Sequence, residues 1–295
     1  MEKQKFKYLP PSKRKKILLI CDDIRVHSGV ATVAKEIVIH TCQHFNWVQM
    51  AGAVKHPEKG KKLDISNDTN KFSGINDSSV ILYPIDGYGD PNLIRQILQM
   101  EKPDALFLFT DPRYFMHIWN MEQEIRKLIP IVYLNIWDDY PAPKYNQPYY
   151  EACDLLMGIS KQTVNINKLV LKGREGKRLF KYVQSNNVLD AFSYIPHGKN
   201  ADMFKPLDVN DEKLKVFKHD LFKNKKYDFV LYFNSRNIRR KQISDAMLAF
   251  RAFLDSLPEE KAKRCAFVLK TENSTDAGTD LITVREYLFD ESYED

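Results

Sequence analysis

Short apolar runs alternate with helix-forming segments along most of this 295-residue chain. The runs expected to form strands are residues 16–21, 47–51, 80–83, 105–109, 131–136, 155–159, 192–195, 229–233 and 265–269. Helical spacing or helix-forming composition is found between them, over residues 30–45, 91–100, 114–128, 161–171 and 238–257. Several runs are almost continuously apolar, as strands covered on both faces are. The alternation therefore predicts an α/β fold, with parallel sheets joined by right-handed helical crossovers.

The pattern divides into two unequal parts. The segment Ile195-Pro-His-Gly-Lys-Asn-Ala-Asp-Met-Phe-Lys-Pro206 closes a strand and precedes a charged helix expected over residues 210–223. We place a domain boundary there, which gives a first Rossmann-like domain over residues 1–208 and a second over residues 209–295. The second part holds only two expected strands, so we expect an incomplete Rossmann-like domain. Two stretches interrupt the alternation: a polar one at 55–79, expected as a surface insertion, and a basic one at 172–187.

The positive charge of the chain is concentrated at its beginning. The formal net charge is +6, and residues 1–16 carry seven basic side chains against one acidic one, so the remainder is neutral. This favours a solvated basic arm over residues 1–15 that leads into the first strand. Contact of the arm with an anionic membrane surface is an alternative. Nucleic-acid binding through the arm and the basic stretch near residue 172 is a weaker one.

Composition also indicates where such a protein works. No run approaches the 18 apolar residues of a membrane span. The four cysteines, Cys21, Cys42, Cys153 and Cys265, show no C-x-x-C spacing, and three lie in apolar runs. That pattern is typical of buried free thiols. We therefore expect a cytoplasmic protein, in contact with a membrane at most peripherally. Neither D-x-D spacing nor a zinc-type His/Cys cluster occurs, so no metal site is predicted.

Ligands of doubly wound folds bind beyond the carboxyl ends of the strands. The first strand-to-helix turn reads Cys21-Asp-Asp-Ile-Arg-Val-His-Ser-Gly-Val30. Ser28 and Gly29 at a helix start let backbone N–H groups approach a ligand oxygen, and the helix dipole adds to the attraction. A purely structural interpretation is equally open, with Ser28 as N-cap and Gly29 serving the turn.

The most informative turn reads Phe233-Asn-Ser-Arg-Asn-Ile-Arg-Arg-Lys241. Arg236 leaves the end of a strand, and Lys241 is expected in the first turn of the next helix. Cations at a helix N-terminus oppose the helix dipole, and a bound anion would relieve that cost. Arg and Lys together are suited to stabilise charge on a phosphate leaving group. A solvated basic turn is the alternative.

Two further positions follow strands of the first domain. The turn Asn135-Ile-Trp-Asp-Asp-Tyr-Pro141 offers Asp138 to sugar hydroxyls and the face of Trp137 to a sugar ring, although Trp137 could equally belong to the core. His197, in the segment that closes the first domain, is a candidate contact because clefts between domains are common ligand sites. A lone histidine is more often structural.

Taken together and in this order, the turns resemble the group 1 family of retaining nucleotide-sugar glycosyltransferases with the two-domain GT-B fold. The matching pieces are His27-Ser-Gly-Val-Ala31, the I-P-[NH]-G…F-x-P segment at residues 195–206, and a strand followed by R-x4-K at residues 229–241. The stretch that begins Leu269-Lys-Thr-Glu-Asn is similar to the family's next strand and loop.

The resemblance implies a function and a site. Arg236 and Lys241 would bind the donor diphosphate and act in catalysis, and Ser28 and Gly29 would approach it from the first domain. The family needs no cofactor or metal; its co-substrate is a nucleotide-diphosphate sugar, and the acceptor, a saccharide, lipid or protein, would lie against the first domain. Two departures stand out. Trp137 occupies a position where many members have histidine, and the family's E-x7-E donor segment belongs beyond Asp295. A GT-B-like binding or scaffold protein without activity is therefore the alternative function.

Overall fold

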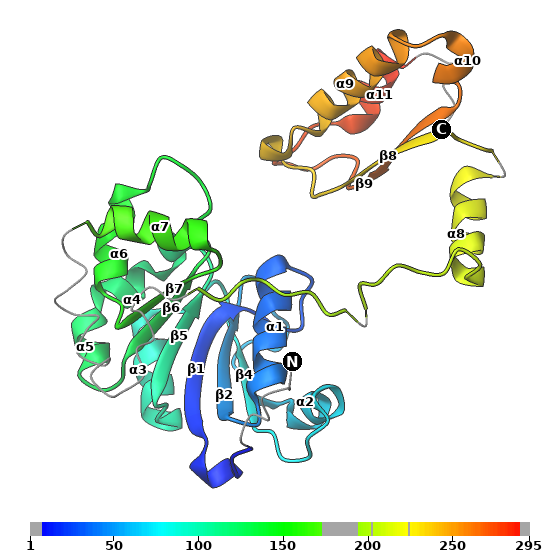
Figure 1. Ribbon diagram of the computed structural model, residues 1–295. Helices are drawn as coiled ribbons and strands as arrows, with labels where there is room; N and C mark the ends of the chain where they lie inside the picture. Colours follow the sequence, from blue (N-terminus) through cyan, green and yellow to red (C-terminus); the bar gives the residue numbers. More distant parts are fainter. Residues whose placement is uncertain (1–7, 173–193, 202, 224, 290–295) are drawn as a thin grey trace. The chain divides into compact units, whose positions relative to one another are not determined.

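The computed structural model describes residues 8–172, 194–201, 203–223 and 225–289. It divides into two compact units, Met1–Asn200 and Ala201–Asp295 (Figure 1). The domain boundary expected near residue 208 stays a prediction. Residues 1–7 of the expected basic arm and most of the basic stretch at 172–187 lie outside the described residues.

The first unit is built on a seven-stranded sheet in the order β3-β4-β2-β1-β5-β6-β7. Its strands are β1 (Lys15–Asp22), β2 (Phe45–Gly52), β3 (Leu63–Asp64), β4 (Val80–Pro84), β5 (Ala105–Phe109), β6 (Ile131–Asn135) and β7 (Leu155–Gly158). All pair in parallel except β3, which is antiparallel to β4 at the edge of the sheet. The expected strand at 192–195 is reduced, among its described residues, to one parallel bridge between Tyr194 and Gly158.

Helices cover both faces of this sheet, as expected for a doubly wound layer (Figure 1). They are α1 (Gly29–Thr41), α2 (Ser66–Ser73), α3 (Pro91–Glu101), α4 (Met116–Asn120), α5 (Glu122–Arg126), α6 (Gln147–Glu151) and α7 (Lys161–Val170), with 3-10 turns η1 (Pro11–Lys13), η2 (Pro112–Phe115) and η3 (Lys144–Asn146). Two apolar clusters result. One joins the sheet to α1, and the other joins it to α3 through α7. In β1, Leu18 and Ile20 enter the second cluster while Leu19 enters the first, so this strand is covered on both faces.

Two features of the first unit differ from expectation. The single helix expected over 114–128 is broken into η2, α4 and α5, because Phe115, at φ −103° and ψ 24°, and Met121, at φ −109° and ψ 18°, leave the helical region. The solvated arm is also shorter than expected. Arg14 is 5% exposed and donates to the Leu9 carbonyl oxygen and to Asp77, and Lys15 and Lys16 already belong to β1.

The second unit is a smaller α/β layer. It contains α8 (Glu212–Phe222), β8 (Phe229–Asn234), the 3-10 turn η5 (Arg239–Lys241), α9 (Ile243–Asp255), α10 (Glu259–Ala262), β9 (Cys265–Lys270) and α11 (Leu281–Leu288). The strands β8 and β9 pair in parallel, and a small apolar cluster joins them to α9 and α11. The helix expected over 238–257 begins only at Ile243, because Gln242 adopts a left-handed conformation with φ 49°.

The cysteines fit the expectation of unpaired thiols. Cys21, Cys42 and Cys153 are buried and Cys265 is half-buried, and all four are free. Burial raises the pKa of the Cys21 thiol, so this group stays protonated. None of the helices that the structure describes is long and apolar enough to cross a lipid bilayer.

Candidate functional site

The β1–α1 loop has the structural N-cap that the sequence left open. Ser28 Oγ accepts a hydrogen bond from the Ala31 N–H at 2.9 Å and donates one to Asp22 Oδ2 at 2.6 Å. Gly29 is the first residue of α1, and a Cβ placed on it would meet no atom within 4 Å. The N-terminus of α1 is therefore capped by one side chain and open above Gly29. Donor binding by Ser28 and Gly29 stays a prediction.

Asp22 is a site residue that the sequence interpretation missed. It is the last residue of β1, is 8% exposed, and also accepts a hydrogen bond from the Tyr88 hydroxyl at 2.7 Å. Burial, reinforced by this bond to the Asp22 carboxylate, raises the pKa of Tyr88. Asp22 thus holds Ser28 from the following loop and Tyr88 from the loop after β4. An acidic residue ending an apolar strand was the available signal.

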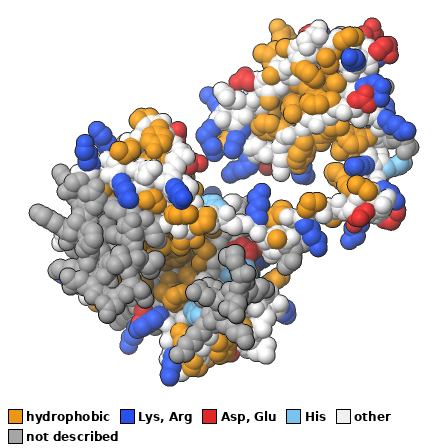
Figure 2. All heavy atoms as spheres, in the orientation of Figure 1, with side chains coloured by type: hydrophobic (Ala, Val, Ile, Leu, Met, Phe, Trp, Pro, Cys, Tyr) orange, Lys and Arg blue, Asp and Glu red, His pale blue; other side chains and the backbone are white. Residues whose placement is uncertain are grey.

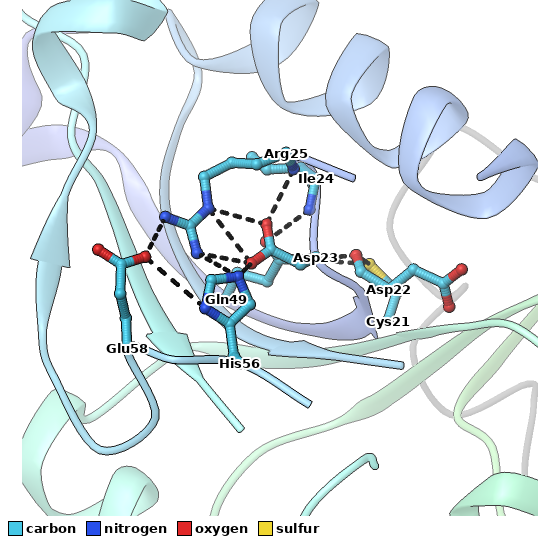
Figure 3. A network of polar contacts seen from close by, with 8 residues as sticks. All are labelled: Cys21, Asp22, Asp23, Ile24, Arg25, Gln49, His56 and Glu58. Atoms are coloured by element: carbon cyan, nitrogen blue, oxygen red, sulfur yellow. Dashed lines mark hydrogen bonds and ion pairs between the residues drawn. The ribbon is translucent and has the colours of Figure 1, made fainter. Parts of the chain in front are cut away.

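Figure 3 shows a second polar network beside this loop. Asp23 is fully buried; it accepts a hydrogen bond from Arg25 Nη2 at 2.7 Å and lies 3.2 Å from His56 Nε2. Arg25 Nη1 also contacts Glu58 at 2.9 Å. Because Arg25 is shared between two carboxylates, chiefly Asp23, its pKa is raised and its charge is neutralised locally. The loop after β2 is thereby fixed to the β1–α1 loop.

In the turn after β6, Trp137 packs against neighbouring side chains and also remains partly accessible. Its ring is half-buried and meets Tyr145 edge-on at 5.9 Å, and Nε1 donates to the Asp139 carbonyl oxygen at 3.1 Å. Arg113 lies over the ring at 5.8 Å from its centroid. The Asp138 side chain is exposed, while its carbonyl oxygen accepts from Gln162 at 2.9 Å. Trp137 is thus anchored by its packing but keeps an accessible edge.

A buried amide network lies beneath this turn. Asn135, at the end of β6, donates to Tyr150 Oη at 2.9 Å and to Asn167 Oδ1 at 2.6 Å, and all three side chains are fully buried. Asn135 Oδ1 also accepts from the Trp137 N–H at 3.1 Å. The start of the turn is therefore held by the core of the first unit.

His197 reaches the same edge of the sheet. Its ring lies 6.3 Å from that of Phe109, the last residue of β5, in an edge-on contact, and the Ile195 N–H donates to the Gly158 carbonyl oxygen at 2.8 Å. Desolvation lowers the pKa of His197, so its imidazole is neutral at pH 7. Since β1, β5 and β6 are neighbours, the turns that carry Ser28, Trp137 and His197 lie along one edge.

In the second unit, cations gather where β8 leads into α9 (Figure 2). Arg236 follows β8, and Arg239, Arg240 and Lys241 form η5; all four side chains are exposed. Lys270, opposite Asn234 in register, ends β9 at the same side of the layer. The expectation that Lys241 lies in the first turn of the next helix was wrong. Lys241 precedes α9, because Gln242 turns the chain before the helix begins.

No ion pair is found for these cations within the described parts of the chain. The same parts contain no cluster of three His, Cys, Asp or Glu side chains placed to hold a metal ion. Asn237, which directly follows Arg236 in this turn, is 2% exposed and does not face solvent. The carboxyl end of the β8–β9 layer is therefore a positive surface formed by five side chains.

The sequence matches no family model and no curated protein. Solved structures, however, resemble this one. An E. coli trehalose-6-phosphate structure bound with UDP-2-fluoro glucose gives a TM-score of 0.55 at 12% identity, covering 92% of this chain and 68% of that one. An α,α-trehalose-phosphate synthase (UDP-forming) from Burkholderia vietnamiensis gives 0.55 at 12% identity, with 93% and 67% covered.

A UDP-GlcNAc 2-epimerase from Neisseria meningitidis bound to UDP-GlcNAc gives a TM-score of 0.50 at 10% identity, covering 93% of this chain and 68% of that one. Identities this low establish the fold alone. The chain is accordingly a GT-B-like α/β protein, with a Rossmann-like parallel-sheet domain followed by a second, smaller α/β layer. The fold class predicted from the sequence is confirmed.

Proposed function

We propose that the protein is a glycosyltransferase that moves a sugar from a nucleotide-diphosphate donor to an acceptor with retention of anomeric configuration. The observation that carries the proposal is the positive surface at the carboxyl end of β8 and β9. Ligands of open α/β sheets bind at that end, and a cluster of exposed cations that find no carboxylate partner among the described residues favours an anion. The UDP-sugar ligands of two structural neighbours support a nucleotide diphosphate as that anion.

Arg236 and Lys241 have different tasks in this proposal. Arg236 offers a planar guanidinium for bidentate contact with phosphate oxygens, and Lys241 adds a point charge. Both stabilise the negative charge that develops on the diphosphate as the sugar leaves. The co-substrate replaces a cofactor, and the two cations take the part that a metal ion would otherwise play.

The first unit would supply the acceptor contacts and part of the donor contacts. Ser28 and Gly29 would approach the donor, because the α1 N-terminus is open above Gly29 and backbone N–H groups there attract oxygen atoms of a ligand. Trp137, Asp138 and His197 provide an aromatic edge, a carboxylate and a neutral imidazole along the same sheet edge. This combination suits hydroxyl-rich acceptors, because sugar hydroxyls exchange hydrogen bonds with carboxylates and imidazoles while a C–H face packs on an aromatic ring. Peripheral membrane contact through the basic residues before Tyr8 belongs to the same proposal.

The test is calorimetric titration of the chain with UDP, GDP and ADP. One of the three should bind saturably, and Arg236→Ala should weaken that binding by about tenfold to hundredfold, the value of a charge-assisted hydrogen bond. Arg264→Ala is the matched control. It removes an exposed arginine that pairs with Asp228, at the opposite end of the β8–β9 layer. Equal affinities of the two variants would refute the site, and no binding of any nucleotide by the wild-type chain would refute the donor class.

One observation favours a second candidate, a GT-B-like protein that binds nucleotide sugar without transferring it. Trp137 stands where many glycosyltransferases of the resembling group carry histidine, and its indole, whose N–H donates to the Asp139 carbonyl oxygen, has no basic ring nitrogen that could replace an imidazole. Incubation of the bound nucleotide sugar with candidate acceptors, followed by NMR of the anomeric proton, separates the two. Formation of a product with the donor's anomeric configuration supports the transferase. Nucleotide-sugar binding without turnover supports the binding protein.

A further inference from the structure

The segment 236–241, which carries Arg236, Arg239, Arg240 and Lys241, is held in place by the buried side-chain amide of Asn237. Asn237 Nδ2 lies within hydrogen-bond distance of three carbonyl oxygens, those of Thr279 at 2.6 Å, Glu272 at 3.1 Å and Asn273 at 3.3 Å. Its Oδ1 accepts from the Thr279 N–H at 3.1 Å, and its own carbonyl oxygen accepts from Thr275 Oγ1 at 2.5 Å. All four partners belong to the loop between β9 and α11.

This amide is placed between the cations in the sequence. Asn237 follows Arg236 directly, and the Arg239 N–H donates to the Ala277 carbonyl oxygen at 3.0 Å. The Lys241 N–H then donates to the Ile238 carbonyl oxygen at 2.8 Å. The Arg239 contact therefore joins the segment to the β9–α11 loop, and the Lys241 contact closes the 3-10 turn within the segment. The charged side chains of the segment are exposed to solvent.

The loop between β9 and α11 leaves room for the Asn237 side chain. A Cβ placed on Gly278 would overlap both Oδ1 and the backbone carbonyl oxygen of Asn237, so only glycine permits this approach. Loss of the Asn237 side chain would leave the facing carbonyl oxygens and the Thr279 N–H without their partner in a buried site. Unsatisfied buried polar groups are costly, so the two loops would move apart or rearrange.

We infer that Asn237 is a positioning residue, which fixes Arg236 and Lys241 in the geometry that binds the donor diphosphate by locking their segment onto the β9–α11 loop. The inference rests on the proposed nucleotide-diphosphate site and adds the device that preorganises it. Preorganised cations lose less freedom on binding than mobile ones. The β9–α11 loop, in which the sequence predicted no site residue, thereby becomes part of the donor site.

The test compares Asn237→Ala with Arg251→Ala. Arg251 also ties two elements of this unit together, because its Nη1 donates to the Leu288 carbonyl oxygen at 2.9 Å, but it lies in the second half of α9. For each variant we would measure the affinity for the nucleoside diphosphate that binds, the affinity for the matching nucleoside, and the melting temperature. Asn237→Ala should weaken binding of the nucleoside diphosphate by about tenfold and leave the affinity for the nucleoside unchanged. Arg251→Ala should lower the melting temperature and leave both affinities unchanged.

Trypsin gives a readout that needs no nucleotide. Cleavage after Arg236 and Lys241 should accelerate in Asn237→Ala and not in Arg251→Ala, because only the former releases the segment. Thr275→Val, which removes one hydrogen bond at constant shape, should give a smaller change in the same direction and serves if Asn237→Ala fails to fold. Unchanged cleavage, or equal weakening of nucleoside and nucleoside diphosphate, would overturn the inference. If cleavage is accelerated in Asn237→Ala but the wild-type chain binds no nucleotide, the proposed function is refuted, while the role of Asn237 in joining the two loops stands.

Discussion

Gly52 has no room for a side chain, because a Cβ there would overlap the carbonyl oxygen of Gly87. That same oxygen accepts a hydrogen bond from the Ala53 N–H at 2.9 Å, and Ala53 itself takes a left-handed conformation with φ 73°. The end of β2 and the loop after β4 therefore meet backbone to backbone. This contact brings Tyr88, the residue after Gly87, to the Asp22 carboxylate at the carboxyl edge of the sheet.

The first prediction concerns this approach. Gly52→Ala should lower the free energy of unfolding by about 2 to 4 kcal/mol, because the obstacle is backbone and cannot rotate away. Urea denaturation measures the change. Gly29→Ala is the matched control, since no atom lies within 4 Å of its Cβ position. A loss below about 0.5 kcal/mol for Gly52→Ala would show that the two loops separate freely.

The second prediction concerns the part of Gly29 in ligand binding. Gly29 begins α1, where alanine is a better helix former, so Gly29→Ala should leave stability unchanged or raise it by up to about 1 kcal/mol. If a ligand oxygen approaches the helix start as proposed, the added methyl group should weaken nucleotide-sugar binding by about tenfold or more. Calorimetry and thermal melting on the same preparation separate the two effects. Undiminished affinity would remove Gly29 from the donor site.

The third prediction concerns stability and pH at Glu101. Burial opposes its ionisation, but contacts with Lys62 Nζ at 2.7 Å, the Tyr83 hydroxyl at 2.5 Å and Lys16 Nζ at 3.2 Å outweigh burial and lower the pKa of Glu101 from 4.5 to about 2. Because the folded-state pKa is the lower one, the stabilisation is complete above about pH 4.5 and is lost as the pH falls towards 2.

Glu101→Gln should therefore cost about 3 kcal/mol of unfolding free energy at pH 7, a value that corresponds to this pKa difference. The gap between wild type and variant should shrink steadily below pH 4.5. Urea titrations at pH 7, 5, 4 and 3 would measure it. A gap that does not depend on pH would mean that the hydrogen bonds of Glu101 do not require its charge.

The fourth prediction concerns Asp22. Asp22→Ala removes the acceptor of both Ser28 Oγ and the Tyr88 hydroxyl, so unfolding free energy should fall by about 2 to 3 kcal/mol. Tyr88→Phe removes only one of the two bonds and should cost about 1 kcal/mol. Thermal denaturation of both variants and of the double variant forms a cycle. Simple additivity of the two losses would show that Tyr88 and Asp22 do not act through their shared hydrogen bond.

Local pattern and long-range contact explain what the sequence could and could not predict. The strand predicted over 105–109 is found as β5 with the same bounds, because a continuously apolar run between helices is typical of a strand buried on both faces of a parallel sheet. Strand β3 was missed, since two residues in a polar stretch carry no periodicity. The burial of Arg14 depends on Asp77, which is remote in the sequence. No local pattern identifies such a partner.

The candidate site divides in the same way. The N-cap interpretation of Ser28, one of the two that the sequence left open, is confirmed, because capping is decided within four residues. Lys241 lies outside α9 because Gln242 adopts a left-handed conformation, which could not be predicted from the amino-acid composition of this turn. Asn237 looked like one more polar side chain of a basic turn. Its burial depends on a loop that comes after β9, which only the folded chain brings near.

The contact between Asn237 and Gly278 also constrains how this protein can diverge. A larger residue at 278 is tolerated only if the segment around 237 moves, because its Cβ would overlap the backbone carbonyl oxygen of Asn237 as well as the side chain. Replacing Asn237 removes only the side-chain part of this overlap, so the asparagine requires the glycine but the glycine does not require the asparagine. Among related chains, we expect every lineage that keeps the asparagine to keep the glycine as well, whereas glycine can remain where the asparagine is lost, so that the asparagine would mark the lineages that retain this form of anion site.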